Sequence, residues 1–145
     1  LEAFMLIPQL SIFVQDKVGR VAEICGLLAA QGINVAGFDI ADTTEGFGIL
    51  HLVVDDTEKA LQVLHDHHVA VRNIPVLCVL LENRPGRLAK ILDLLSKAQL
   101  SLEYIYLGSD NNMFVGTNDN ARAASLLEDA DFRILHTADL AQERD

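Results

Sequence analysis

The sequence has no tryptophan and few other aromatic residues, six Phe and two Tyr in 145 residues. Half of its residues are nevertheless hydrophobic, so the chain can form a core, and that core must be aliphatic. No apolar run approaches the roughly 20 residues that a helix needs to cross a bilayer. The longest, residues 74–81, has the length of a strand, which excludes a membrane-spanning helix.

Cysteine is scarce, and basic residues are outnumbered by acidic ones. Cys25 and Cys78 lie in apolar helix and strand patterns, so we expect two buried free thiols in a reducing cytoplasm. Lys and Arg number 11 against 21 Asp and Glu, which gives a net charge of −10 at pH 7. This charge repels phosphate backbones and anionic lipids, so it argues against nucleic acid or a membrane as a partner.

The chain contains an internal repeat. Residues 11–38 align without a gap with residues 78–105, at a constant offset of 67 that places Gly19 on Gly86. The second halves align at an offset of 63, with Ala60 on Ala123, so the second copy is four residues shorter between its middle strands. The repeat predicts two small domains, residues 8–74 and 75–137, followed by a flexible tail at 138–145.

Both copies show the same order of expected elements. In the first copy we expect strands at 9–15, 33–41, 47–54 and 68–73, and helices at 18–31 and 55–66. Gly32 ends the first helix, and a capping box of Asp55 and Glu58 opens the second. In the second copy Pro85 stands in the first turn of the first helix. The order βαββαβ predicts an α+β, ferredoxin-like module, a four-stranded antiparallel sheet with both helices on one face.

The turn between the first strand and first helix of each copy is the main candidate for a binding site. It reads QDKVGR in the first copy and ENRPGR in the second. A Gly-containing turn that opens a helix exposes backbone N–H groups, which favour a carboxylate. Asp16 and Asn83 could accept a hydrogen bond from an ammonium group, so the turn could hold both ends of a free amino acid. The alternative is a plain structural turn with a helix cap.

Two long segments, DKVGRVAEICGLLAAQGINV from Asp16 and NRPGRLAKILDLLSKAQLSL from Asn83, resemble ACT domains. The resemblance covers residues 8–136, and residues 82–86, ENRPG, are similar to the loop of serine-inhibited phosphoglycerate dehydrogenases. It implies tandem ACT-like regulatory modules with ligand sites between two units, where the loop of one faces the second strand of the other. The residues so implied are Asn83, Arg84, Pro85, Gly86, Arg87 and Leu88 with Asn34, and Asp16, Val18, Gly19, Arg20 and Val21 with Ser101.

Two further groups have alternative interpretations. Arg20 and Arg87 could steer a carboxylate or could lie over apolar neighbours. His65, His67 and His68 suggest a metal site, but no carboxylate or Cys pattern completes a tetrahedral set. We interpret them as a solvated helix terminus, where a cationic His is favourable.

The loop residues and the resemblance together imply a non-catalytic regulatory protein that binds a free amino acid at the interface between its two domains. We expect no catalytic residues, no metal and no cofactor. A metabolic enzyme is a candidate partner, and exposed sheet edges favour a homodimer. The alternative is a ligand-free protein–protein interaction or oligomerisation module. A small enzyme on the same scaffold has less support, because no acid, base and nucleophile converge.

Overall fold

The computed structural model describes residues 6–15, 17–43 and 45–140, with only the backbone of Lys17. The chain divides into two compact units. Residues 8–74 form the main part of the first unit, and the second unit combines residues 75–139 with the segment that ends at Ile7. The chain then runs through a short 3-10 helix, η2 (Thr137–Leu140). The first residues of the predicted flexible tail are therefore helical, and residues 141–145 lie outside the described part.

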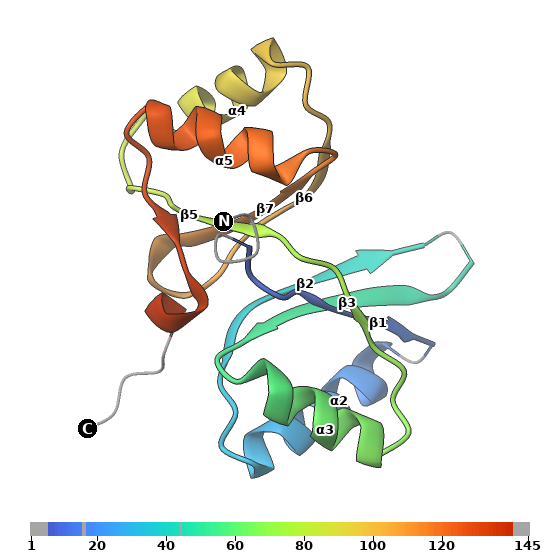
Figure 1. The fold of residues 1–145 in the computed structure, drawn as a ribbon. Coiled ribbons are helices and arrows are strands. Elements are labelled where there is room, and N and C mark those ends of the chain that lie inside the picture. Colours follow the sequence, from blue (N-terminus) through green and yellow to red (C-terminus); the bar gives the residue numbers. More distant parts are fainter. Residues whose placement is uncertain (1–5, 16, 44, 141–145) are drawn as a thin grey trace. The chain divides into compact units, whose positions relative to one another are not determined.

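The first unit is a four-stranded antiparallel sheet in the order β2-β3-β1-β4. Figure 1 shows both of its helices on one face of this sheet. The elements in chain order are β1 (Leu10–Val14), α2 (Lys17–Ala30), β2 (Val35–Asp42), β3 (Gly48–Val54), α3 (Thr57–Asp66) and β4 (Arg72–Asn73).

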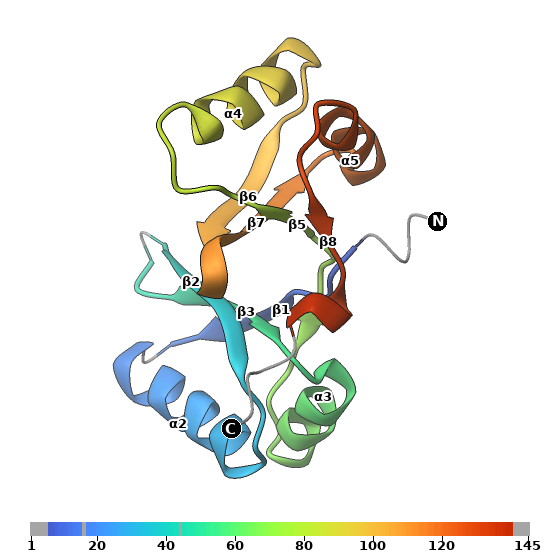
Figure 2. The same cartoon turned by 90° about the vertical axis from the view of Figure 1, so that its left-hand side faces the viewer.

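The second unit repeats this topology with the strand order β6-β7-β5-β8. Its helices again lie on one face of the sheet (Figure 2). The elements are β5 (Leu77–Leu80), α4 (Arg87–Lys97), β6 (Leu102–Leu107), η1 (Ser109–Asn111), β7 (Asn112–Thr117), α5 (Asn120–Asp129) and β8 (Ile134–Leu135). The predicted α+β fold of two ferredoxin-like βαββαβ modules is thereby confirmed.

The segment before the first repeat belongs to the second unit. The N–H of Ile7 donates to the carbonyl of Val76 at 2.7 Å, and the N–H of Val76 donates back at 2.9 Å. Ile7 is fully buried, and Leu6 packs against the core of the second unit. The second structural unit therefore contains the second sequence repeat and, in addition, this segment from before the first repeat.

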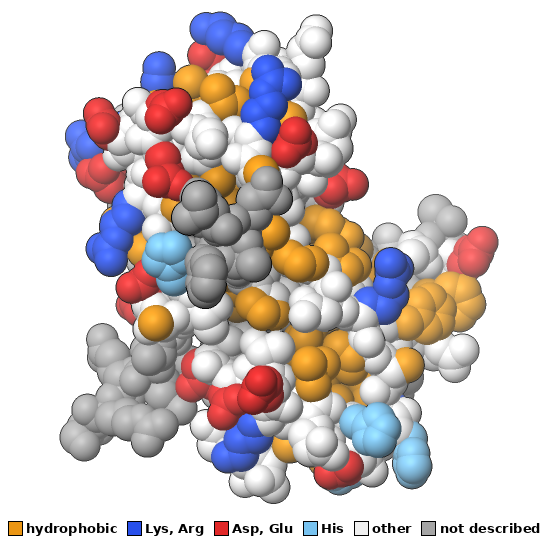
Figure 3. Space-filling model, in the orientation of Figure 1, with side chains coloured by type: hydrophobic (Ala, Val, Ile, Leu, Met, Phe, Trp, Pro, Cys, Tyr) orange, Lys and Arg blue, Asp and Glu red, His pale blue; other side chains and the backbone are white. Residues whose placement is uncertain are grey.

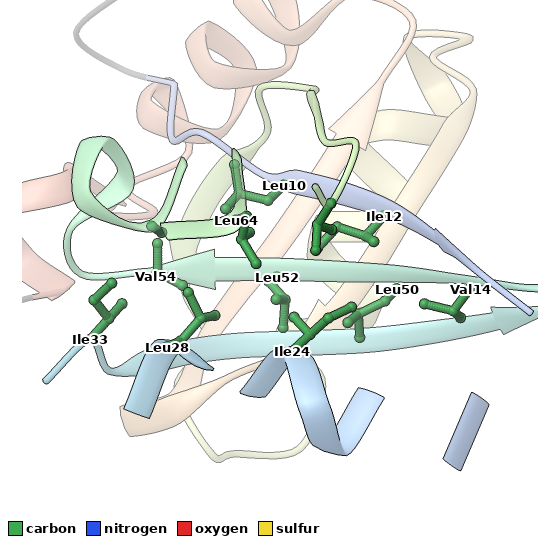
Figure 4. Close-up of a cluster of buried hydrophobic side chains, with 12 residues drawn as sticks. Leu10, Ile12, Val14, Ile24, Leu28, Ile33, Leu50, Leu52, Val54 and Leu64 are labelled. Atoms are coloured by element: carbon green, nitrogen blue, oxygen red, sulfur yellow. The ribbon is translucent and has the colours of Figure 1, made fainter. Parts of the chain in front are cut away.

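Each unit has its own aliphatic core between sheet and helices. In the first unit the alternating residues Leu10, Ile12 and Val14 of β1 are buried against the stripe of α2 that contains Ile24 and Leu28 (Figure 4). The period of two in the strand and the 3–4 spacing in the helix explain this packing. The core of the second unit contains the aligned residues Leu77, Val79, Ile91, Leu95, Leu100, Met113, Val115, Ala123 and Leu127.

The length difference between the copies lies in one hairpin turn. Ile40 pairs with Leu50 in the first unit, and Leu107 pairs with Met113 in the second. These partners are separated by nine residues in the first unit and by five in the second. The second unit makes this turn with η1, in which Asp110 and Asn111 have left-handed φ angles of 55° and 60°.

Two expected helix starts are wrong in detail. Asp56, not Asp55, caps α3, because its Oδ1 accepts the N–H of Lys59 at 3.1 Å. Pro85 lies before α4 rather than in its first turn, since Gly86 is the N-cap with a left-handed φ of 88°. In both cases the helix begins one or two residues later than the pattern indicates.

The first helix of each unit ends in the same left-handed turn. Gly32 has φ 71°, as predicted for a C-cap, and the N–H of Ile33 donates to Leu28 at 3.1 Å. In the second unit Gln99 takes this place with φ 59°, and the N–H of Leu100 donates to Leu95 at 3.0 Å. A residue with a Cβ is strained in this conformation, whereas Gly is not.

Exchange of these two residues should have opposite effects on stability. We expect Gln99→Gly to raise the free energy of unfolding by about 1 kcal/mol and Gly32→Gln to lower it by a similar amount. No atom lies within 4 Å of a Cβ built on Gly32, so the cost there is conformational, not steric. Urea denaturation followed by circular dichroism measures both. A loss of stability in Gln99→Gly would contradict the strain argument.

Candidate functional site

The β5–α4 loop is the best-defined part of the predicted site. The N–H of Leu81 donates to the carbonyl of Asn111 at 2.9 Å, which ends strand pairing, and the N–H of Arg84 donates back to Glu82 at 2.8 Å. Gly86 then opens α4 without a side-chain cap. A helix that starts this way offers its first N–H groups to an external acceptor.

Space is open beside this helix start. No atom lies within 4 Å of a Cβ built on Gly86, although its φ of 88° favours glycine. Asn83, Arg84 and Pro85 are exposed, and the side chain of Leu88 is 42% exposed. The loop therefore presents an amide, a guanidinium and a free helix terminus to solvent, with an apolar side chain on the next turn.

Arg87 is held more firmly than the rest of the loop. Its guanidinium carbon lies 4.2 Å from the ring centroid of Phe132, a cation–π contact. One terminal nitrogen, Nη2, lies 3.5 Å from a carboxylate oxygen of Glu82. Its Nε is buried and has no hydrogen-bond partner among the described residues. The two expectations for this arginine are thus compatible, because it lies over an apolar ring and still points a charged nitrogen at a carboxylate.

The loop of the first unit has a different local structure. Its helix α2 begins at Lys17, so Val18, Gly19 and Arg20 lie in the first helical turn. Val18 is 85% exposed, whereas Val21 packs against the core. Arg20 Nη1 pairs with Glu23 Oε1 at 3.1 Å. Asp16, the predicted acceptor of an ammonium group, lies outside the described residues.

Asn34 and Ser101 occupy equivalent places just before β2 and β6. The backbone N–H of Asn34 donates to Asp55 Oδ1 at 2.9 Å, and that of Ser101 donates to Asn118 Oδ1 at 2.9 Å. Both residues are exposed. A β-bulge follows each of them, between Val35 and Gly37 or between Leu102 and Tyr104.

Sequence reasoning missed the residues that hold these positions. Asp55 and Asn118 each stand directly before a helix cap, Asp56 or Asp119, and the two pairs align at the offset of 63. Asp55 was assigned to a capping box, which hid its role as acceptor for Asn34. The recurrence of two consecutive side-chain acceptors in both copies was the available signal.

The loop and the start of the second strand lie at opposite ends of the sheet. Val14, at the loop end of β1, pairs with Gly48 at the start of β3, whereas Val35 pairs with Val54 at its end. These ends of β3 are roughly 20 Å apart at the rise of a strand. The loop and Asn34 of one unit are therefore too far apart to touch one small ligand together.

Two hollows within single units contain little of the predicted site. One, of about 590 Å³, has a lining that includes Glu58, Leu61, His65, Val69 and Val71. The other, of about 510 Å³, lies at the end of α4 and includes Ser101. The β5–α4 loop lines neither of them.

The histidines at the end of α3 contact groups of their own helix. His67 Nδ1 lies 2.9 Å from the carbonyl of Val63, and His65 Nδ1 lies 3.8 Å from Asp66. His51 is buried on β3, with Nδ1 3.6 Å from Asp39 Oδ2. Within the described residues, no three His, Cys, Asp or Glu side chains are grouped as a metal site requires.

No helix in the described part of the chain is both long and apolar enough to span a bilayer.

Neither thiol is poised as a nucleophile. Both cysteines are free. Burial, together with the negative charge of Asp139, raises the pKa of Cys78 from 9.0 to about 12, and burial also raises the pKa of the half-buried Cys25. A thiol reacts as its thiolate, so the raised pKa lowers the reactivity of each thiol near neutral pH, most strongly for Cys78.

Thiol labelling should reflect this burial. In Cys25→Ser protein, where Cys78 remains, we expect no reaction with a disulfide reagent at pH 8 until denaturant is added. The folded state raises the pKa of Cys78 from 9.0 to about 12. The contribution of the protonated thiol to the free energy of unfolding is therefore full below pH 9.0, and it decreases as pH rises toward about 12. Rapid labelling of the native Cys25→Ser protein would show that Cys78 is accessible.

Comparison with known proteins identifies relatives of the whole chain. The family model described as an ACT domain pair matches residues 5–142. The crystal structure of protein BT0572 from Bacteroides thetaiotaomicron is 34% identical, with 94% of this chain and 96% of that chain covered and a TM-score of 0.86. A search of curated protein sequences finds no match.

Two solved structures share the fold at lower identity. The regulatory subunit of aspartate kinase from Thermus thermophilus, in a ligand free form, is 19% identical, covers 85% of this chain and 91% of its own, and has a TM-score of 0.60. The structure of aspartokinase alpha and beta subunits is also 19% identical, with coverage of 85% and 90% and a TM-score of 0.59.

Proposed function

Because the chain belongs to the family of ACT domain pairs, we propose that it is a non-catalytic regulatory protein that binds a free amino acid. The β5–α4 loop carries this proposal, since Gly86 opens an uncapped helix beside two arginines. The fold is shared with the regulatory subunit of aspartate kinase from Thermus thermophilus, whose structure is a ligand free form. A ligand of that subunit is consistent with the ligand that we propose for this chain.

The loop has suitable groups for both ends of an amino acid. The first N–H groups of α4 and the guanidinium of Arg87 are donors for the α-carboxylate. The exposed amide oxygen of Asn83 is an acceptor for the α-ammonium group. Leu88, the second residue of the helix, is an apolar contact for the ligand side chain.

A second unit has to complete the site. Since the loop and Asn34 of one unit lie at opposite ends of a sheet, we propose that the Asn83 loop of one unit works with the exposed Asn34 of another. The unit that supplies Asn34 belongs either to the same chain or to a homodimer partner, and the geometry within one unit is compatible with both. The mirror combination joins Arg20 with Ser101, and of the two we favour the Asn83 combination, which has an amide on both sides.

A composite site gives binding a regulatory consequence. An amino acid that bridges two units stabilises the arrangement in which they are bridged, and therefore shifts the population toward it. A metabolic enzyme that binds one arrangement more tightly than the other would respond to this shift. The amino acid would then change the affinity for the enzyme by the same factor by which the enzyme changes the affinity for the amino acid. The proposal thus includes an enzyme partner that is regulated without any catalysis by this chain.

A thermal-shift screen tests amino-acid binding. Against the twenty proteinogenic amino acids at about 1 mM, we expect one or a few to raise the melting temperature, because they bind only the folded state. Asn83→Ala and Asn34→Ala should each abolish the shift while leaving the melting temperature of the free protein unchanged. Asn73→Ala, an exposed amide on β4, is the matched control and should keep the full response.

Two outcomes separate the binding from its location. If no amino acid shifts the melting temperature of the wild-type protein, the amino-acid sensor is wrong. If a shift occurs but survives in both Asn83→Ala and Asn34→Ala, the protein binds an amino acid at another place.

One observation favours the alternative of a ligand-free interaction module. The edge strands β2 and β6 carry exposed apolar side chains at aligned positions, Phe38 and Ile40 on β2 and Ile105 and Leu107 on β6. Phe38 pairs with Leu52, whose side chain is buried in the core beneath the helices, yet Phe38 itself is 67% exposed. Figure 3 shows further hydrophobic side chains gathered over the free end of the β2–β3 hairpin. Such open edges favour self-association.

Self-association through β2 can be tested by one charge. We expect Phe38→Asp to shift the protein toward monomer in light scattering coupled to gel filtration, because a carboxylate at an apolar contact loses its solvation. Phe38→Leu should keep the oligomer. An unchanged mass for Phe38→Asp would show that this edge is not the interface. An oligomer with no amino-acid response would favour the interaction module.

A further inference from the structure

The β5–α4 loop contains an acidic side chain that occupies its own arginines. Glu82 Oε2 accepts from Arg84 Nε at 3.0 Å and lies 2.8 Å from Arg84 Nη2. The other oxygen, Oε1, lies 3.5 Å from Arg87 Nη2. One carboxylate thus bridges two guanidinium groups at the start of α4, where the loop otherwise offers donors to an anion.

The other copy of the loop distributes the same charges differently. Gln15 aligns with Glu82, and the arginine at the aligned position, Arg20, pairs with Glu23 on its own helix. Lys90 aligns with Glu23. The acid that neutralises the arginine therefore stands on the helix in the first unit and in the loop in the second.

We propose that Glu82 is a built-in competitor for the ligand carboxylate, an inference that rests on the proposed function of this loop. The side chain of Glu82 carries the same chemical group as the α-end of an amino acid, and it takes the donor that the ligand would use on Arg87. The ligand must displace Glu82 from Arg87, so Glu82 sets the concentration at which the loop responds.

The exposure of the three side chains fits such an exchange. Arg87 is only 24% exposed and is fixed over Phe132, whereas Glu82 is 47% exposed and Arg84 is 62% exposed. Exposed ion pairs are weak, so Glu82 can leave without disrupting the fold. The guanidinium of Arg87 stays in place over Phe132 and can donate from Nη2 to the carboxylate of a ligand. Glu82 released from Arg87 can remain paired with Arg84.

Acetate is the simplest probe of this competition. In isotope-labelled protein, sodium acetate is titrated against sodium chloride at equal ionic strength, and the backbone amide signals of Gly86 and Arg87 are followed. We expect Glu82→Gln to lower the acetate midpoint about two- to fivefold, the range of one exposed ion pair. Glu23→Gln removes the aligned arginine's partner in the other unit and should leave this midpoint unchanged.

Several results would overturn the competition. These are an equal or higher acetate midpoint in Glu82→Gln, or the absence of any response at Gly86 and Arg87 in both proteins. An equimolar mixture of the twenty amino acids, assayed by thermal shift, separates this inference from the proposed function. If the mixture stabilises wild type but not Glu82→Gln, Glu82 binds the ligand ammonium and the competition is wrong. If the mixture stabilises neither protein while the acetate midpoints differ as expected, the amino-acid function fails and the competition stands.

Discussion

The antiparallel pairing of one inner strand, β3 or β7, with its two neighbours is the constraint on which each unit depends. The register of β3 against β1 brings Leu50 and Leu52 onto the same side as Ile12 and Leu10, and so creates the face that the helices cover. The same register sets the two candidate regions at opposite ends of the sheet. The core and the separation of the two candidate regions are thus consequences of one pairing, and the proposed site therefore takes its two parts from different units.

Much of this architecture could be predicted because it depends on period and repetition. The alternation in β1 and the stripe on α2 are visible in the residues, and the duplication doubles every signal. Local backbone geometry was less accessible. Gly19 and Gly86 align without a gap, yet Gly19 lies inside a helical turn and Gly86 is a left-handed N-cap. Alignment reports a shared ancestor, whereas φ depends on neighbours such as Pro85 that only one copy has.

Contacts between distant side chains were the least predictable. Nothing in the spacing indicates that Phe132 lies under Arg87, because the two come from different elements of the second unit. The aligned residue Val69 offers Arg20 no aromatic ring, and Arg20 pairs with its own helix instead. The two copies have the same pattern of core residues but pair their aligned arginines, Arg20 and Arg87, with different partners. A difference in binding between the two loops would arise at these arginines.

The segment around Ile7 has a consequence for the way the chain can be divided. A protein cut between Ile74 and Pro75 would follow the boundary of the repeats, but its second fragment would lack the buried Ile7 and both hydrogen bonds to Val76. A circular permutant that starts at Pro75 would keep this segment, because joining the original termini places Ile7 between the two repeats. The second repeat thus depends on a segment that precedes the first repeat in the chain, so separating the two repeats at their boundary would destabilise the second one.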